Sequence, residues 1–421
     1  MRLIPPFALI ASVVAGFAIS PASAAIFAQW VQLGPDSSAS VRAITDEACP
    51  AVAFDGVAMA MRVRAEPDAK FANVPSSRFP VRSCEADVPA GAKSAAIAGK
   101  PLPLPRPDPH RILVFGDTGC RLKMPDQVQD CNDPKAWPFA KIVASAAAAK
   151  PDLVIHVGDY HYREDPCPAG RAGCAGTPYG YGWEPWNLDF FVPAEPLLAT
   201  APWSMVRGNH EDCERAGEGW FRFLDRAPMS SACRDLTGIF VSRLGDFGVV
   251  NVDGAFAVDP KKDPDSLVAL LRQQLAEISG KIPGDAWLAT HRPLDAMRGS
   301  KDKLVTDNQV EEAAFGSDLP KSVHMLVSGH IHFFQANDFG GEHVPQLVVG
   351  MGGDDLEPKP QASMGGASIN GNRVVSSTTY SGYGYMIWEK QGGLWQGVLY
   401  DTDGAKLGTC RLEGRSLSCG S

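Results

Sequence analysis

The sequence has no run of basic residues, and its acidic residues outnumber the basic ones. The formal net charge is -9 at pH 7, from 48 Asp and Glu against 39 Lys and Arg. Such a chain lacks the cationic surface that attracts nucleic acids or anionic membranes, so we expect neither as a partner. An anionic ligand would have to be attracted locally rather than by the field of the whole protein.

The sequence also has no stretch beyond residue 24 that is long and apolar enough to cross a membrane. Residues 1–24 are typical of a secretory signal, because Arg2 precedes an apolar core from Phe7 to Ile19 and Ala22-Ser23-Ala24 matches a small-residue cleavage site. A membrane anchor is the alternative, but the core is short and prolines interrupt its flanks. We expect export to the periplasm or beyond the cell, with cleavage and no stable membrane insertion afterwards.

A further absence concerns cysteine, since no C-x2-C pair is present and a structural zinc site is therefore disfavoured. The ten cysteines are an even number, which in an exported chain predicts disulfides. Sequence alone does not fix their connectivity. The simplest hypothesis joins neighbours along the chain: Cys49–Cys84, Cys120–Cys131, Cys167–Cys174, Cys213–Cys233 and Cys410–Cys419.

The 421 residues have an ordinary globular composition and divide at a proline-rich stretch. Alternating residues such as Val57 to Val63 predict β-strands in the first part. The stretch from Lys100 to Pro107 carries a proline at every second position and is interpreted as a stiff linker. We therefore predict a signal peptide (1–24), an N-terminal β-rich domain with its linker (25–105) and a larger domain (106–421).

In the larger domain, short apolar runs alternate with helical patterns, which favours an α/β fold. Ile112–Phe115 and Leu153–Val157 are expected strands, and Trp137–Lys150 and Ser266–Ile278 are expected helices. Residues 163–192 and 352–384 are predicted long loops, the first one an ordered lid or substrate wall. Residues 385–421 alternate again and predict a terminal hairpin or meander.

Five short polar motifs each follow an apolar run, where the active site of an open α/β sheet forms. They are Gly116-Asp117-Thr118-Gly119, Gly158-Asp159-Tyr160-His161-Tyr162, Gly208-Asn209-His210-Glu211, Ala289-Thr290-His291 and Gly329-His330-Ile331-His332. Each motif alone is more often a turn or a structural histidine than a ligand. Together they predict a two-metal site whose candidate ligands are Asp117, Asp159, Tyr162, Asn209, His291, His330 and His332.

These ligand types match two different ions. Carboxylate and phenolate suit a hard ion such as Fe(III), whereas imidazole and amide oxygen suit divalent Fe, Zn or Mn. Asp159 has two oxygens with which to bridge the ions, and Tyr162 three residues later faces the same way if the chain turns helically. Two ions roughly 3.5–4 Å apart activate a water and clamp both oxygens of a phosphoryl displacement. His210 stands beside Asn209, in position to contact the phosphate or protonate the leaving group.

Read in order as GDTG, GDYHY, GNHE, LATH and GHIH, the motifs resemble those of the calcineurin-like metallophosphoesterases. They are most similar to the purple acid phosphatases, whose blocks are GDxG, GDxxY, GNH(D/E), VxxH and GHxH. The resemblance covers roughly residues 111–350. It implies a four-layer α/β/β/α sandwich, often with a small N-terminal β domain. It also implies an Fe(III) site formed by Asp117, Tyr162 and His332, a bridging Asp159, and a divalent site formed by Asn209, His291 and His330.

The sequence departs from this family pattern in three places, one of which concerns the proton donor and another, the long insert after Tyr162, the substrate preference. Leu288 replaces the usual Val, and Met297–Lys301 has no histidine where these phosphatases often place one. His210 and His161 are therefore the candidates for the general acid. Arg207, directly before Gly208, is a candidate phosphate contact, with a structural salt bridge as an equal alternative.

These observations predict an exported dimetal acid phosphatase that acts on small phosphomonoesters by attack of a metal-bound hydroxide, with His210 and Asp159 in catalytic roles. Its cofactors would be Fe(III) and a divalent Fe, Zn or Mn ion. One alternative is a phosphodiesterase or nucleotidase with the same metals. The other is a non-catalytic metal-binding protein, which the complete ligand set disfavours.

Overall fold

The computed structural model describes residues 25–125, 127–255, 264–300, 303–305, 308–316, 319–358 and 364–420. The predicted signal peptide lies outside these ranges. Within them, every helix is too short or too polar to cross a membrane.

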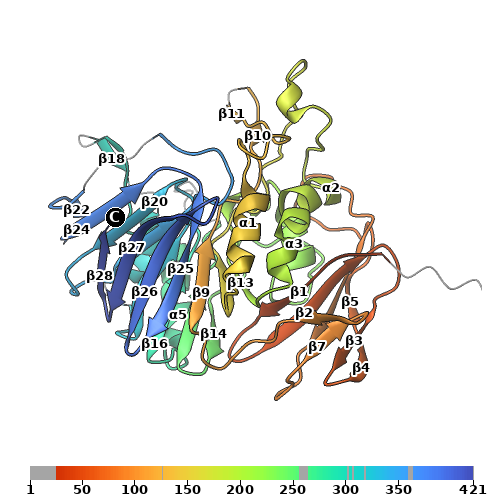
Figure 1. The fold of residues 1–421 in the computed structure, drawn as a ribbon, viewed down its shortest axis with the longest axis horizontal. Coiled ribbons are helices and arrows are strands. Elements are labelled where there is room, and N and C mark those ends of the chain that lie inside the picture. The colour runs from red at the N-terminus through yellow and green to blue at the C-terminus, as the bar shows by residue number, and fades with distance from the viewer. Residues whose placement is uncertain are drawn as a thin grey trace, which may run out of the picture.

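The described residues form two large sheets that together draw on strands from most of the chain (Figure 1). The larger sheet has the strand order β28 (Ser416–Gly420), β27 (Lys406–Glu413), β26 (Leu394–Asp401), β25 (Gly384–Gln391), β9 (Arg111–Phe115), β12 (Leu153–His156), β13 (Trp203–Met205), β1 (Ile26–Leu33), β2 (Ala39–Thr45), β6 (Arg82–Asp87) and β5 (Arg62–Ala65). The smaller sheet has the order β14 (Phe240–Leu244), β15 (Phe247–Asn251), β16 (Asp285–Ala289), β19 (Val323–Ser328), β21 (Gln346–Val349), β20 (Phe334–Asp338) and β24 (Ser376–Tyr380).

Alternation along strand β9 shows how the layers form. Ile112 and Val114 point into a core shared with Trp287 of the smaller sheet, so the two sheets pack face to face. Leu113 and Phe115 point the other way, into a core that includes helices α1 (Phe139–Ala148) and α3 (Val192–Leu198). Both faces of this strand are buried, as expected for a strand that lies between two layers.

The smaller sheet is covered in the same way on its outer face. Leu288 of β16 and Leu326 of β19 pack with Leu271 of α5 (Pro264–Ser279) and Phe315 of α6 (Gln309–Phe315). The order of layers is therefore helix, sheet, sheet, helix, which confirms the predicted α/β/β/α sandwich. The expected strands and helices of the larger domain are present, with ends that differ by up to two residues.

The N-terminal part is β-rich, as predicted, but most of it belongs to the larger sheet. Strand β1 pairs in parallel with β13, at Gln32 and Trp203, and β2, β6 and β5 continue outward from it. A separate small sheet contains β4 (Val57–Ala60), β3 (Ala51–Phe54), β7 (Ala95–Ile97) and β8 (Lys100–Leu102). The predicted linker is therefore wrong at Lys100–Leu102, where β8 pairs with β7. The division of domains at residue 105 stays a prediction.

The C-terminal residues form the predicted meander, β25 to β28, which pairs with β9. The two predicted long loops are partly ordered into elements. Residues 163–192 include helix α2 (Trp183–Trp186) and a π-helical turn at Asn187–Phe191, and residues 352–384 include β22 (Ser368–Ile369), β23 (Asn372–Arg373) and β24. All five predicted disulfides are confirmed.

Candidate metal centre

The five polar motifs meet at one end of the two packed sheets. Asp117 lies two positions after the end of β9, and Asp159 lies three positions after the end of β12, both in the larger sheet. His291 and His330 follow β16 and β19 of the smaller sheet in the same manner. Carboxyl ends of parallel strands lie at one edge of a sheet, so this local pattern brings together residues far apart in sequence.

The chain turns sharply at these positions. Asp117, Asp159 and His330 have φ angles of 59°, 56° and 67°, a left-handed conformation that is uncommon for residues with a side chain. Glycine at the adjoining positions allows the loops to pack closely. A Cβ atom at Gly208 would lie 2.0 Å from Oδ1 of Asp159, and one at Gly329 would lie 2.3 Å from Oδ2 of Asp117. Gly208 and Gly329 are thus required by space, whereas Gly158, with a φ of 101°, is also favoured by its left-handed conformation.

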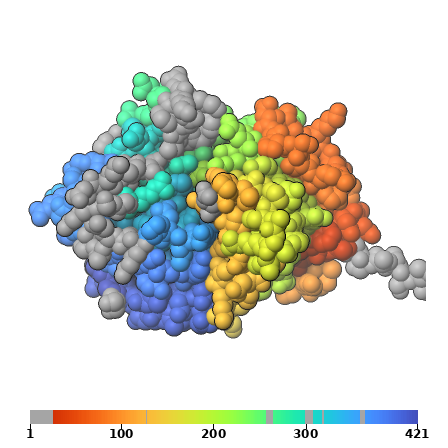
Figure 2. All heavy atoms as spheres, turned by 90° about the horizontal axis from the view of Figure 1, so that it is seen from above, coloured from red at the N-terminus to blue at the C-terminus, as the bar shows by residue number. Residues whose placement is uncertain are grey.

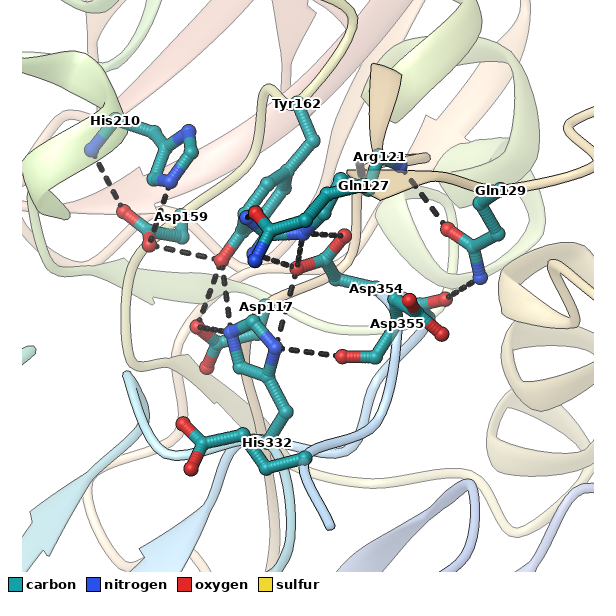
Figure 3. Close-up of polar contacts among 12 residues, drawn as sticks. Asp117, Arg121, Gln127, Gln129, Asp159, Tyr162, His210, His332, Asp354 and Asp355 are labelled. Atoms are coloured by element: carbon teal, nitrogen blue, oxygen red, sulfur yellow. Dashed lines mark hydrogen bonds and ion pairs between the residues drawn. The ribbon is translucent and has the colours of Figure 1, made fainter. Parts of the chain in front are cut away.

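One group of candidate ligands surrounds the Tyr162 hydroxyl (Figure 3). This oxygen lies 3.0 Å from Oδ1 of Asp117 and 2.8 Å from Oδ2 of Asp159. Nε2 of His332 lies 3.2 Å from the same hydroxyl and 3.3 Å from Oδ1 of Asp117. Three oxygen donors and one imidazole nitrogen therefore converge on a small buried volume.

The second group shares Asp159 with the first. Nε2 of His291 lies 3.0 Å from Oδ2 of Asp159 and 3.1 Å from Oδ1 of Asn209. Asp159, His291 and His330 each offer a ligand atom, and these atoms lie within 4.8 Å of one another. Asp159 thus stands between the two groups, as expected of a bridging carboxylate.

The electrostatics of this cluster favour bound cations. Burial raises the pKa of Tyr162 well above its usual value, and the charges of Asp117 and Asp159 raise it further. Burial lowers the pKa of His332, but Asp354 and Asp117 outweigh it and raise that pKa to about 9. His291 responds in the same way to Asp159, with a pKa of about 8. Buried negative oxygens facing imidazole nitrogens fit a pair of metal ions better than they fit an apolar or anionic ligand.

Glu211 holds the loops of the centre together, a role that sequence reasoning missed. Its Oε1 accepts hydrogen bonds from the backbone N–H groups of Tyr160 and His161, at 2.9 and 3.1 Å. Its Oε2 accepts from those of Asp159 and Gly208, both at 3.1 Å. Glu211 is the last residue of the GNHE motif, so its place in a motif already marked it as a candidate for a role at the centre.

Sequence reasoning also missed the ion pair between Asp354 and Arg121. Asp354 is fully buried, and its Oδ2 lies 3.2 Å from Nδ1 of His332, on the side away from Tyr162. Nε of Arg121 donates to the same oxygen at 3.0 Å, and the Arg121 guanidinium lies 4.7 Å from the centre of the Tyr162 ring. Figure 3 shows this network. The sequence did contain an indication of Asp354, because Gly352-Gly353-Asp354 repeats the arrangement of the five motifs, a glycine and a polar residue shortly after a strand, here β21.

A cavity of about 460 Å³ opens above the metal centre. On the face seen in Figure 2, orange and yellow segments from the first half of the chain abut cyan and blue segments from the second. The candidate ligands Asp159, Tyr162, Asn209, His330 and His332 line the cavity, together with His210. The cavity also contains cationic and anionic side chains outside the motifs: Arg121, Lys123, Arg215, Arg298, Asp355 and Glu357.

Two predicted substrate contacts lie outside the lining of this cavity. His161 is fully buried, its Nε2 lies 2.9 Å from the carbonyl oxygen of Gly180, and its ring packs near Trp186. Arg207 is buried and donates hydrogen bonds to the carbonyl oxygens of Glu211 and Arg234, both at 2.8 Å. Arg207 also pairs with Asp253 at 3.3 Å, the structural alternative considered for it. Both residues hold neighbouring loops in place.

Comparisons with known proteins agree with this geometry. The family model for calcineurin-like phosphoesterases matches residues 110–334. Among solved structures, the purple acid phosphatase PPD1 from yellow lupin (Lupinus luteus) seeds aligns over 91% of this chain and 74% of its own, with 13% identity and a TM-score of 0.55. PhoD aligns over 94% of this chain and 92% of its own, with 12% identity and a TM-score of 0.57. At such identities the likeness shows a shared fold.

A search of curated proteins finds no match. The family model nevertheless spans more than half of the chain and contains all five motifs, from Asp117 to His332. The metal-ligand pattern, the four-layer fold and this match together show that the chain belongs to the calcineurin-like phosphoesterase family.

Proposed function

We propose that this protein is an exported dimetal phosphatase that hydrolyses small phosphomonoesters. The observation that carries the proposal is the position of Asp159 between Tyr162 on one side and His291 on the other. The proposed ligands of an Fe(III) ion are Asp117, Tyr162 and His332, and those of a divalent Fe, Zn or Mn ion are Asn209, His291 and His330. The bound ions would activate a water and polarise the phosphate.

The residues of the chain supply the remaining parts of the reaction. His210 lines the cavity, and its Nε2 lies 4.0 Å from Oδ2 of Asp159, so the imidazole borders the place where the phosphate would sit. Its Nδ1 lies 2.7 Å from Oε1 of Glu164. We assign to His210 the transfer of a proton to the leaving oxygen. The buried ion pair of Arg121 with Asp354 holds His332 from behind.

Hydrolysis of p-nitrophenyl phosphate by the metal-loaded protein tests this function. Activity should disappear on chelation, return when metal is added back, and fall by at least 10³-fold in Asp159→Ala, since both ions would lose their shared ligand. A rate on bis(p-nitrophenyl) phosphate that exceeds the monoester rate would instead assign a phosphodiesterase. Full activity in Asp159→Ala would overturn the proposed centre.

The metal assignment has its own optical test. Tyrosinate bound to Fe(III) gives a visible charge-transfer band, so the iron-loaded protein should be coloured. The band should vanish in Tyr162→Phe, while Tyr160→Phe, which changes a neighbouring buried tyrosine, should keep it. A colourless protein with full metal content would remove Fe(III) from the proposal and leave the phosphatase reaction with other ions.

Export is supported by the five disulfides, because such cross-links persist in oxidising compartments. N-terminal sequencing of protein recovered from the periplasm or the medium should begin at Ala25, directly after the predicted cleavage site. Recovery of the uncleaved chain from the cytoplasm would contradict this part of the proposal.

A further inference from the structure

One wall of the cavity carries two cations, Lys123 and Arg215, beside a single carboxylate, Glu164. Strand β10 (Leu122–Lys123) lies beside residues 162–165, because Leu122 donates its N–H to the carbonyl oxygen of Tyr162 at 3.0 Å and accepts from Asp165 at 2.9 Å. This pairing places Lys123 next to Glu164. Nη1 of Arg215 lies 3.7 Å from Oε1 of the same Glu164. Both cations line the cavity.

Positive charge is in excess on this wall. Glu164 already contacts His210, at 2.7 Å, so one carboxylate serves both His210 and Arg215. In the described part of the chain, no carboxylate lies within ion-pair distance of Lys123, and Nη1 of Arg215 is buried without a hydrogen-bond partner. A buried guanidinium nitrogen that lacks a partner is costly unless a ligand supplies one.

The other two cations of the cavity, Arg298 and Arg121, each have a carboxylate partner. Nη1 of Arg298 lies 3.3 Å from Oε1 of Glu357, and Arg121 pairs with Asp354. Among the described residues, the one lining cation without an ion-paired carboxylate is therefore Lys123, on the same wall as Arg215. The whole protein carries a net charge of -9, so an anionic substrate gains its attraction from this wall and from the metals rather than from the surface.

Disulfides stiffen both segments that present the surplus cations. Lys123 lies inside the loop closed by Cys120–Cys131, and Arg215 lies inside the loop closed by Cys213–Cys233. Long cationic side chains pay an ordering cost on binding, and anchoring their backbones beforehand reduces that cost. The two cross-links therefore preorganise the wall.

We propose that Lys123 and Arg215 form a subsite for a second anionic group of the substrate, a carboxylate or a second phosphate remote from the ester that is cleaved. This subsite rests on the proposed phosphatase function and names its substrate class: phosphomonoesters whose leaving group ends in an anion. Arg215 binds the anion through Nη1, and Lys123 adds a second charge-assisted hydrogen bond. Glu164 holds the guanidinium toward the cavity.

Three esters with the same three-carbon leaving group test the subsite without changing the chemistry of cleavage. The far carbon carries a hydroxyl, a carboxylate or a second phosphate. The metal-loaded wild type should show a kcat/KM at least tenfold higher for an anionic terminus than for the hydroxyl. A charge-assisted hydrogen bond contributes about 1.5–3 kcal/mol, so Arg215→Met and Lys123→Met should each reduce this preference by roughly 10-fold or more. Their kcat/KM for the hydroxyl ester should fall by a smaller factor, because its far carbon carries no charge for the subsite to bind.

Matched controls separate the subsite from general charge effects. Arg171→Met and Lys141→Met remove the same charges from exposed ion pairs outside the cavity lining, with Asp130 and Asp403, and should keep the wild-type preference. Arg215→Lys and Lys123→Arg should retain most of it. Where Arg215→Met does not fold, as judged by thermal melting, Arg215→Lys and Lys123→Met still decide the matter.

The outcomes distinguish the anion subsite from the phosphatase function on which it rests. A preference for the bisphosphate alone assigns the subsite to phosphoryl groups, and a preference for both anions assigns it to anions in general. Equal kcat/KM for all three esters in the wild type, or an equal loss on all three in the methionine variants, overturns the subsite but keeps the phosphatase. Failure of the metal-loaded wild type to hydrolyse any ester overturns the proposed function, and the subsite falls with it.

Discussion

The imidazole of His210 stands between Glu164 and Asp159. Its Nδ1 lies 2.7 Å from Oε1 of Glu164, and its Nε2 lies 4.0 Å from Oδ2 of Asp159. The ring also packs 4.0 Å from that of Tyr162, measured between centroids. Burial lowers the pKa of His210 to about 4, and the carboxylates of Asp159 and Glu164 offset part of that fall. Glu164 also holds the ring so that Nε2 faces the cavity.

Glu164→Gln should therefore slow cleavage most where the leaving group needs a proton. We expect kcat for an alkyl phosphate to fall by about 10²-fold, within the range that general acid catalysis contributes. The rate on 2,4-dinitrophenyl phosphate, whose leaving group departs as an anion, should change by less than about threefold. Glu214→Gln alters an exposed carboxylate nearby and should leave both rates unchanged. Equal losses on both substrates would reduce Glu164 to a structural role.

Asp354→Asn should weaken metal binding without removing a proposed ligand. The buried carboxylate contacts Nδ1 of His332, and loss of such an outer partner commonly lowers metal affinity by about 10–100-fold. Competition with a chelator, followed by metal analysis, measures the change. Asp338→Asn removes another buried carboxylate, on strand β20, and should retain the wild-type affinity. An unchanged affinity in Asp354→Asn would show that His332 needs no such support.

Glu311 should make the fold less stable as pH rises. Burial raises its pKa from 4.5 to about 7, so the folded state binds a proton that the unfolded state releases between these values. The free energy of unfolding therefore falls as pH rises from about 4.5 to about 7 and loses about 3 kcal/mol from this group. Urea unfolding at pH 5 and pH 8 measures the difference. Glu311→Gln should reduce the fall, and an identical pH dependence in both proteins would contradict the assignment.

Removing metal should lower the thermal stability. Asp117 and Asp159 each place an oxygen within 3.0 Å of the buried Tyr162 hydroxyl, and without cations the two carboxylates repel each other. Metal at about 1,000 times its dissociation constant stabilises a protein by about 4 kcal/mol. We expect the melting temperature to drop by several degrees in a chelator and to recover when Fe or Zn is restored. A melting temperature that is the same with and without the chelator would mean that the centre binds no metal tightly.

Much of the centre was predictable because its signals are local. Each candidate ligand follows a strand by one to a few residues. Because the carboxyl ends of parallel strands lie at the same edge of a sheet, these residues come close together in the fold. Arg121 and Asp354 escaped prediction because they are 233 residues apart and only the fold brings them together. His161 and Arg207 are sequence neighbours of candidate ligands, but neighbouring residues in a turn point in different directions, so proximity in sequence did not place them in the cavity.

The fold was predictable to a similar extent. Buried apolar runs such as Ile112–Phe115 indicate strands, and the meander of the C-terminal part follows from its alternation. The pairing of β1 with β13 did not follow, because a proline-rich stretch after residue 100 resembled a boundary between independent units. The proline content of a segment indicates how stiff that segment is. It does not indicate which distant strands will pair, because pairing depends on which strands of the sheet have an unpaired edge.

That pairing also sets the smallest fragment worth expressing. The stretch matched by the family model, 110–334, includes β9 and β13 but neither of the strands that flank them, β25 and β1. Cut out alone, it would leave backbone groups unpaired at β9 and β13 and also at β19, whose partner β21 lies outside the segment, and we expect it to aggregate. The loops with the candidate ligands are thus held by a sheet whose outer strands, on both sides, lie outside residues 110–334. Changes in those outer strands should therefore affect the candidate metal centre as well as the fold.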